Sequence, residues 1–511
     1  MFLLYGRNYR WFAVLTVMLT MFNTLLTSTI INVAIPEVMG SFGVTQDKAQ
    51  WLSTGFLASG TITMLLSSWA VNVLGMRAVF AWAMTIFLLS TIISGTAPSI
   101  EVLIIARTVQ GAAAGIIMPI AMLINYQVFP ANNRGMAMGI FGVGVMFAPA
   151  LGPTLGGYMI DAYSWRFVFF IGIPFSLLSI PMALIFMPQR DLAAPLAKFD
   201  WIGSLLMSIF LLAVLTALSD VMEYGWTSDY IVSRLGCAFM SAVLFVWWEL
   251  QIDDPMLDLS LFTNPRFVAA SLVTFVVGAG LYASTYLLPL FLQILQGVPA
   301  LDSGLMMLPA GIAMAIMFPI AGYISDRTQP RNLIIIGLIC FGISSFVLRD
   351  ITIDTPFIEL IYWFILGRIG LALIFPCLNV ASLGTLPLSQ LSQGSGTVNF
   401  LRQLGSAFGV NAVAIFVSNR TSLYSDQLAV TQTYTSNTFE MIASLRELIA
   451  SYGLPALYEQ VSTGSFISRI IYNQASTLAY RDGFLAVGVV FFLTVIPSWF
   501  MTIQRQADET D

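Results

Sequence analysis

Fourteen runs of about 20 mostly apolar residues follow one another along the chain, and they constrain its fold more than any other feature. A helix of roughly 20 such residues crosses the hydrocarbon core of a bilayer. Charged residues make up only 9% of the chain, whereas a soluble protein carries about 25%. The chain is therefore predicted to be an all-α membrane protein. The runs lie near residues 11–33, 51–72, 78–97, 102–127, 136–160, 166–187, 201–219, 232–250, 267–289, 303–325, 332–349, 358–384, 396–418 and 483–503.

Lysine and arginine are unevenly divided between the two sides that these runs define. If the N-terminus is cytoplasmic, ten basic residues lie in cytoplasmic segments and four in short outer loops. This excess follows the positive-inside rule, so both termini are predicted to be cytoplasmic. The inner residues are Arg7, Arg10, Arg77, Arg134, Arg190, Lys198, Arg266, Arg327, Arg331 and Arg505, and the outer ones are Lys48, Arg166, Arg234 and Arg349.

Two short loop sequences indicate an internal repeat. SWAVNVLGMR at 68–77 and GYISDRTQPR at 322–331 stand 254 residues apart, an interval that contains eight apolar runs. Two six-helix bundles with two helices inserted between them would give this spacing, and repeated halves around a central site are typical of transporters. The predicted domains are a first bundle at 1–190, inserted helices at 191–260 and a second bundle at 261–511.

One polar segment, 419–482, interrupts the pattern on the outer side before the last run. Phe439, Ile442, Leu445, Leu448 and Ile449 recur in it at helical spacing, and Phe466, Ile470 and Ile471 behave similarly. Two interpretations remain open. These stretches are either amphipathic helices that lie on the membrane surface or helices that dock a partner.

Residue types that carry most catalytic chemistry are scarce. The chain has no histidine, and its three cysteines are isolated within apolar runs. It has no GxxxxGK[ST] phosphate loop. We therefore expect neither a metal site nor a cofactor, and no nucleic-acid partner. A membrane-embedded enzyme or a non-transporting sensor would have no evident catalytic set.

Small residues dominate the fifth run, which reads GIFGVGVMFAPALGPTLGG at 139–157. Gly144, Ala148, Gly152 and Gly156 recur every four residues, so on a helix they form one ridge without large side chains. Such a ridge lets a neighbouring helix approach backbone to backbone. Pro149 and Pro153 lie in the same stretch, and each removes a backbone donor and bends the helix.

The sequence of this ridge resembles motif C, the antiporter motif of exporters in the major facilitator superfamily. GYISDRTQPR resembles motif A of the same superfamily through Gly322, Asp326, Arg327 and Arg331, and its first-half copy is degraded at Ser68 and Asn72. IARTVQGAAAG resembles motif B, which contains Arg107 and Gln110. AYSWRFVFFIGIP, FDWIG, DLSLF, YLLPLFLQ, SGLMMLPAGI and SGTVNFLRQLGSAFG resemble the fourteen-helix drug:proton antiporter branch (DHA2), and most of all its EmrB-type multidrug exporters.

The resemblance implies a fold, an activity and partners. The fold would be the major facilitator fold with 14 transmembrane helices. The activity would be proton-coupled export by alternating access, in which Arg107 and Gln110 take part in coupling and Asp326 and Arg327 in a latch between helices. The partners of EmrB-type exporters in Gram-negative bacteria are a periplasmic adaptor protein and an outer-membrane channel.

The first run departs from the family at its best-known position. TLLTSTIINVAIP matches the first-helix motif, but Thr27 replaces the usual membrane-embedded aspartate. No acidic residue lies near the middle of any run. Threonine cannot exchange a proton as its exposure changes, so proton coupling rests on the resemblance.

Arg107, Arg368 and Arg402 place three positive charges inside the membrane, where a charge marks a functional hypothesis by default. They suggest a cavity for anionic or weakly acidic compounds. Alternatively, each caps helix carbonyls or pairs with an acid at a helix end. The candidate cavity residues are Asn23, Thr27, Asn32, Gln110, Asn125, Phe147, Tyr282, Tyr286, Gln293, Asn379 and Asn399.

These features together predict an inner-membrane secondary exporter of hydrophobic or amphipathic toxic compounds. The alternative is a specific exporter of an anionic metabolite or siderophore that shares the same fold.

Overall fold

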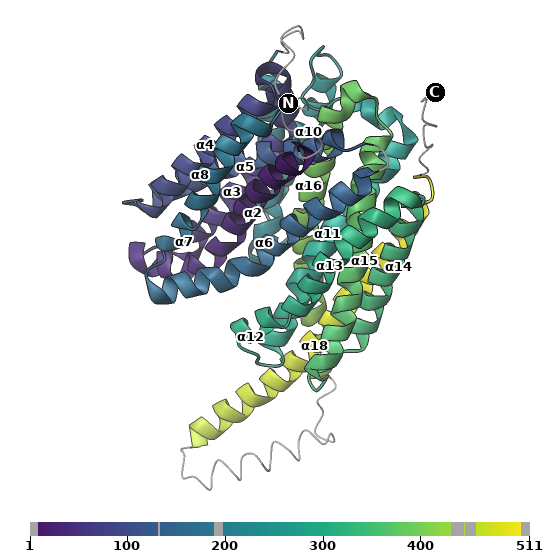
Figure 1. The fold of residues 1–511 in the computed structure, drawn as a ribbon. Coiled ribbons are helices and arrows are strands. Elements are labelled where there is room, and N and C mark those ends of the chain that lie inside the picture. Colours follow the sequence, from purple (N-terminus) through teal and green to yellow (C-terminus); the bar gives the residue numbers. More distant parts are fainter. Residues whose placement is uncertain (1–8, 131–132, 189–197, 431–443, 445–455, 502–511) are drawn as a thin grey trace.

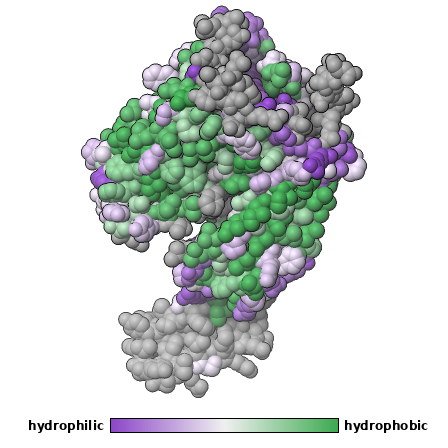
Figure 2. Space-filling model, in the orientation of Figure 1, coloured by the Kyte–Doolittle hydropathy of each residue, from purple (hydrophilic) through white to green (hydrophobic). Residues whose placement is uncertain are grey.

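The computed structural model describes residues 9–130, 133–188, 198–430, 444 and 456–501. All regular structure in these residues is helical (Figure 1). Apolar side chains cover the flanks of both lobes of the molecule, as expected of a surface that faces lipid (Figure 2). The predicted all-α membrane architecture is confirmed.

The first bundle contains six long helices in the order of the predicted runs, one of them broken. The run at 166–187 is divided at Ile171 into a short helix and a longer one. The elements are α2 (Tyr9–Phe42), α3 (Gln46–Leu74), α4 (Met76–Gly95), α5 (Ile100–Val128), α6 (Arg134–Ala162), α7 (Phe167–Phe170) and α8 (Gly172–Phe186).

Two inserted helices and a second bundle follow. The inserted pair, α9 and α10, packs together, and α9 also contacts α3 and α16, one helix of each bundle. The elements are α9 (Trp201–Tyr224), α10 (Asp229–Glu249), η3 (Leu259–Thr263), α11 (Pro265–Ile294), α12 (Ala300–Leu305), α13 (Leu308–Arg327), α14 (Pro330–Val347), η4 (Leu348–Asp350), α15 (Phe357–Gly384), η5 (Leu388–Gln390), α16 (Leu391–Val430) and α18 (Ala456–Ser498).

Thirteen helical segments in the described residues are long and apolar enough to span a membrane. They cover every predicted run except the fifth. That run lies in α6, a continuous helix of 29 residues, although several side chains in its middle lie outside the described part. The predicted domain boundaries stay predictions.

The predicted outer segment 419–482 is shorter than the sequence suggested. Helix α16 continues to Val430 and α18 already begins at Ala456, and the first turns of α18 extend beyond the bundle (Figure 1). The stretch around Ile470 is thus part of α18 and not a separate surface helix. The other predicted stretch, 439–449, lies outside the described residues except for Ser444.

The two bundles meet at one end of the molecule. This end carries the α3–α4 and α13–α14 loops, together with the start of α2 and the end of α18 (Figure 1), and we call it the predicted cytoplasmic end. Toward the opposite, predicted outer end, an indentation separates the two lobes (Figure 2). The molecule is therefore closed on the predicted cytoplasmic side and parted on the other.

Candidate functional site

Close helix packing in the first bundle places the first buried arginine. A Cβ atom on Gly111 would stand 2.2 Å from the carbonyl oxygen of Phe56, and one on Gly115 would stand 2.1 Å from that of Gly60. Only glycine permits α5 and α3 to approach so closely. One turn before Gly111, this approach brings Arg107 onto the backbone of α3.

Arg107 is fully buried and bonded to carbonyl and amide oxygens. Its Nε donates to the carbonyl oxygen of Leu52 at 3.3 Å, and Nη1 donates to that of Thr27 at 3.3 Å and to Oε1 of Gln110 at 2.7 Å. The guanidinium carbon lies 4.4 Å from the ring centroid of Phe56. Nη2 has no hydrogen-bond partner among the described residues.

Gln110 extends this network to a fourth helix. Its Nε2 donates to Oγ1 of Thr91 on α4 at 2.6 Å. One chain of hydrogen bonds therefore joins α2, α3, α4 and α5 through two side chains that the sequence had paired by their i, i+3 spacing. No described carboxylate forms an ion pair with Arg107.

Thr27 reaches this network through its backbone only. Its side chain is buried, and Oγ1 lies 3.4 Å from the point where a Cβ of Gly172 on α8 would stand. The position where the family has an acid is therefore occupied by a hydroxyl packed toward α8.

The other two membrane arginines belong to the second bundle. Arg368 of α15 is 5% exposed, donates from Nη2 to Oγ1 of Thr285 at 2.8 Å and lies 4.3 Å from the ring centroid of Phe364. Arg402 of α16 donates to Oδ1 of Asn399, one turn earlier. Neither guanidinium has an ion-pair partner among the described carboxylates. The predicted trio is thus split, with one arginine in the first bundle and two in the second.

The candidate cavity residues fall into different environments. Asn125 donates to the carbonyl oxygen of Ala121 in its own helix, and Asn23 donates to Ser176 on α8, so both serve helix packing. Tyr282 is 43% exposed and Tyr286 is half-buried. Asn379 is buried, Asn399 is held by Arg402, and Gln293 is exposed near the end of α11. The side chains of Asn32 and Phe147 lie outside the described part.

The small-residue ridge of α6 packs against α2 of its own bundle. A Cβ on Gly152 would stand 2.3 Å from Oγ1 of Thr29, and one on Gly156 would stand 2.8 Å from Cγ1 of Ile30. The packing at Gly144 is looser, because a Cβ there would stand 3.4 Å from Cε of Met18. Ala148 is buried. The side chains of Pro149 and Pro153 are among those not described. In this conformation the ridge lies inside the first bundle and not between the bundles.

A second glycine face of α6 makes the contact between bundles, and the sequence analysis missed it. Cβ atoms on Gly135 and Gly139 would stand 2.4 Å and 2.3 Å from the carbonyl oxygens of Gly322 and Phe318 on α13. Conversely, a Cβ on Gly322 would stand 2.1 Å from the carbonyl oxygen of Gly135. The four-residue spacing of Gly135 and Gly139 was the available signal.

Asp326 completes this contact. Its two carboxylate oxygens accept hydrogen bonds from the backbone N–H groups of Gly135 at 2.6 Å and Met136 at 2.9 Å, in the first turn of α6. A carboxylate there satisfies free donors and meets the positive end of the helix dipole. Arg327 instead lies over Tyr323 of its own helix, 4.1 Å from the ring centroid. The crossing contact therefore depends on the aspartate.

A further inter-bundle contact, between α16 and the helices α3 and α5, is made by uncharged residues. Ser395 of α16 donates from Oγ to the carbonyl oxygen of Pro119 on α5 at 2.7 Å. A Cβ on Gly396 would stand 3.1 Å from the carbonyl oxygen of Met64 on α3. Asn72, the counterpart of Asp326, has an exposed side chain.

Comparisons with known proteins agree with this architecture. The sequence profile of the Major Facilitator Superfamily matches residues 17–410. The MFS-type transporter YhcA of Bacillus subtilis (strain 168), itself uncharacterized, is 34% identical over 81% of this chain and 78% of its own length. The multidrug export protein EmrB of Escherichia coli (strain K12) is 28% identical over 94% of this chain and 93% of its own.

A solved structure shows the same fold. The human organic anion transporter MFSD10 superimposes with a TM-score of 0.60 over 96% of this chain and 99% of that chain, at 15% sequence identity. Profile, relatives and fold agree with the all-helical architecture described above. The chain therefore belongs to the major facilitator superfamily, a family of multi-pass membrane transporters, and is similar to its EmrB-type multidrug exporters.

Proposed function

We propose that this protein exports hydrophobic or amphipathic toxic compounds across a bacterial inner membrane, with both termini in the cytoplasm, in exchange for protons. The observation that carries the proposal is the closure of the two bundles at one end only, through Asp326 and the first turn of α6. Alternating access requires such a contact to form in one state and break in the other. The likeness to named multidrug exporters supports the choice of substrate class.

Proton coupling in this proposal involves the network of Arg107, Gln110 and Thr91. The network joins four helices of the first bundle and contains an arginine with one unpartnered nitrogen. Any rearrangement of α2 or α3 changes the carbonyl oxygens of Thr27 and Leu52 that Nη1 and Nε contact. Because Thr27 cannot carry a proton, we infer that coupling runs through this network together with an acid at a helix end.

The alternative function, specific export of an anionic metabolite or siderophore, is favoured by one observation. Arg368 and Arg402 lie in the same bundle without a described carboxylate partner. Unpaired guanidinium groups bind carboxylates strongly where water is excluded. A substrate carboxylate between α11, α15 and α16 would supply the missing charge.

Transport in inverted membrane vesicles distinguishes these functions. Internal pH and uptake are followed for matched anionic, neutral and cationic compounds, with empty vesicles and the Arg107→Gln variant as references. Proton release coupled to several unrelated compounds supports multidrug antiport, and transport limited to one anion supports the alternative. Uptake without any proton response in the wild type would refute antiport.

The adaptor protein and outer-membrane channel of EmrB-type systems remain predicted partners. We infer that an adaptor would contact the outer ends of α16 and α18, which continue to Val430 and begin at Ala456. Co-purification of a co-expressed periplasmic adaptor with the full chain, compared with a variant shortened within 431–455, tests this assignment. Equal recovery from both would contradict it.

A further inference from the structure

Two buried carboxyl groups meet at the predicted cytoplasmic ends of the inserted helices. Asp200 precedes α9 and is 5% exposed, and Glu249 ends α10 and is 4% exposed. Oδ2 of Asp200 and Oε1 of Glu249 lie 1.9 Å and 2.9 Å from the point where a Cβ of Gly203 would stand. Both oxygens therefore border the same small space, which exists because residue 203 has no side chain.

The other oxygen of each carboxyl is used by the fold. Oδ1 of Asp200 accepts from the backbone N–H of Gly203 at 2.9 Å and from Nε1 of Trp248 at 2.8 Å. Oε2 of Glu249 accepts from the backbone N–H of Leu257 at 3.3 Å. The two oxygens that border the shared space have no partner among the described residues. Each carboxyl is thus held on one side and unsatisfied on the side facing the other.

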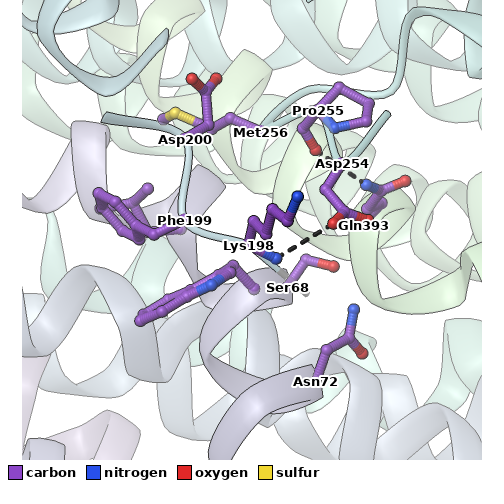
Figure 3. A pocket seen from close by; sticks show the side chains of 11 residues that line it. Ser68, Asn72, Lys198, Phe199, Asp200, Asp254, Pro255, Met256 and Gln393 are labelled. Atoms are coloured by element: carbon purple, nitrogen blue, oxygen red, sulfur yellow. Dashed lines mark hydrogen bonds between the residues drawn. The ribbon is translucent and has the colours of Figure 1, made fainter. Parts of the chain in front are cut away.

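No described cation neutralises this pair. Neither carboxyl forms an ion pair with a residue in the described part of the chain. A cavity of about 60 Å³ adjoins Asp200, and the charged groups that line it are Lys198 and Asp254. In Figure 3 the carboxyl group of Asp200 points away from the side-chain amine of Lys198. The backbone N–H of Lys198 donates a hydrogen bond to Oδ2 of Asp254 at 3.1 Å. The polar residues that the neighbouring helices α3 and α16 contribute to the cavity lining are uncharged: Ser68, Asn72 and Gln393.

We propose that Asp200 and Glu249 form a proton-binding site in which one proton is shared between the two facing oxygens. Two carboxylates this close and this buried cannot both be ionised without a large electrostatic cost. A proton between them converts two unsatisfied acceptors into one hydrogen bond and removes one charge. The cavity beside Asp200 is large enough for water, which gives the proton a route to the predicted cytoplasmic side.

Loss of this proton would loosen the junction between the inserted helices and the second bundle. Glu249 holds the backbone of Leu257, and the same segment accepts a hydrogen bond from Gln393 of α16 through the carbonyl oxygen of Pro255 at 3.2 Å (Figure 3). Repulsion between two carboxylates acts directly on this segment. The site therefore senses pH at a contact with α16, independently of the transported compound and of whether the protein is an antiporter.

Infrared spectroscopy of the purified full chain in lipid nanodiscs tests the proposal. At neutral pH the wild type should show a protonated carboxyl band that disappears as the pH is raised. Glu249→Gln should lack the band, and Asp200→Asn should move its loss to lower pH because the neighbouring charge is gone. Asp220→Asn, which removes an acid paired with Arg234 elsewhere in the inserted pair, should leave the band unchanged.

Thermal unfolding over the same pH range provides a second readout that does not depend on the spectrum. The folded state holds the extra proton, so wild-type stability should fall as the pH rises. Glu249→Gln imitates the protonated side chain, so it should fold and show a smaller loss of stability at alkaline pH. A wild type without the carboxyl band, or with the same band in Glu249→Gln, would overturn the proposal.

Discussion

Two of the inter-bundle contacts occupy corresponding positions in the two predicted repeats but use different chemistry. In the second repeat, Asp326 of α13 accepts two backbone hydrogen bonds at the start of α6. In the first, Asn72 is exposed, and α16 is held instead by the hydroxyl of Ser395 and the close approach of Gly396. One contact therefore combines charge with glycine packing, whereas the other has only neutral packing.

The difference shows that contacts at corresponding places in the two predicted repeats need not use the same chemistry. The charge on Asp326 interacts with the dipole of α6 and with the free N–H groups of its first turn. The carboxylate reaches these groups only when α6 and α13 are in contact. The neutral contact loses a hydrogen bond and van der Waals packing when it opens. We expect the Asp326 contact to control opening and the Ser395 contact to follow it.

Among changes at these two contacts, the largest effect is expected from filling the glycine contact between α6 and α13. In Gly322→Ala the new Cβ would stand 2.1 Å from a backbone carbonyl oxygen, so the helices must separate. We expect closure to weaken by about 1–3 kcal/mol and transport to fall at least roughly tenfold. Vesicle transport and the distance between spin labels on the two bundles measure this.

Gly157→Ala is the matched control for this change. Gly157 also lies in α6, but its Cβ would have nothing within 4 Å, so transport should be unchanged. Gly152→Leu is a different case, because the ridge it belongs to packs on α2. Gly152→Leu should abolish transport while leaving the protein in the membrane. The larger side chain would displace α2 from α6 within the first bundle and so disturb closure. Normal transport by Gly152→Leu would show that the ridge tolerates a side chain.

Asp326→Asn should have the next largest effect. The amide can still accept one hydrogen bond but loses the charge, which costs about 1–2 kcal/mol at a helix N-terminus. The population open at the predicted cytoplasmic end should rise, as measured by spin-label distances between α6 and α13. Unchanged distances would mean that the charge is irrelevant to closure.

Ser395→Ala should have a smaller effect on the other contact. It removes one hydrogen bond to the carbonyl oxygen of Pro119, worth about 0.5–1.5 kcal/mol. The distance between labels on α5 and α16 should broaden, whereas that between α6 and α13 should not. If both distances broaden equally, the two contacts open as one unit and the proposed order is wrong.

The smallest effect is expected from Asn72→Asp. Restoring an acid in the first repeat adds at most about 1 kcal/mol of charge–dipole stabilisation, because the side chain is exposed and screened. Transport should change less than about fivefold. A loss as large as that of Asp326→Asn would show that the neutral character of this contact is required.

Much of the fold could be predicted because the bilayer restricts the choice of structure. A run of about 20 apolar residues must be a helix whose backbone is satisfied internally, so thirteen spanning helices were recovered, and α6 covers the remaining run. The pairing of Arg107 with Gln110 followed from helix periodicity alone. The extent of 419–482 as a loop was wrong, because helices α16 and α18 continue past the lipid core into polar sequence.

The sequence by itself therefore determined the helices, their order and the residues that share a helix face. Only the tertiary structure decided which glycine face of α6 packs against which bundle. Both faces have the same four-residue spacing of small residues in the sequence, so the spacing does not distinguish them. It also decided that Asp326 caps α6 and that Glu249 lies beside Asp200, 49 positions earlier in the chain. Such contacts depend on how helices pack in three dimensions, and local spacing carries no information about partners that distant.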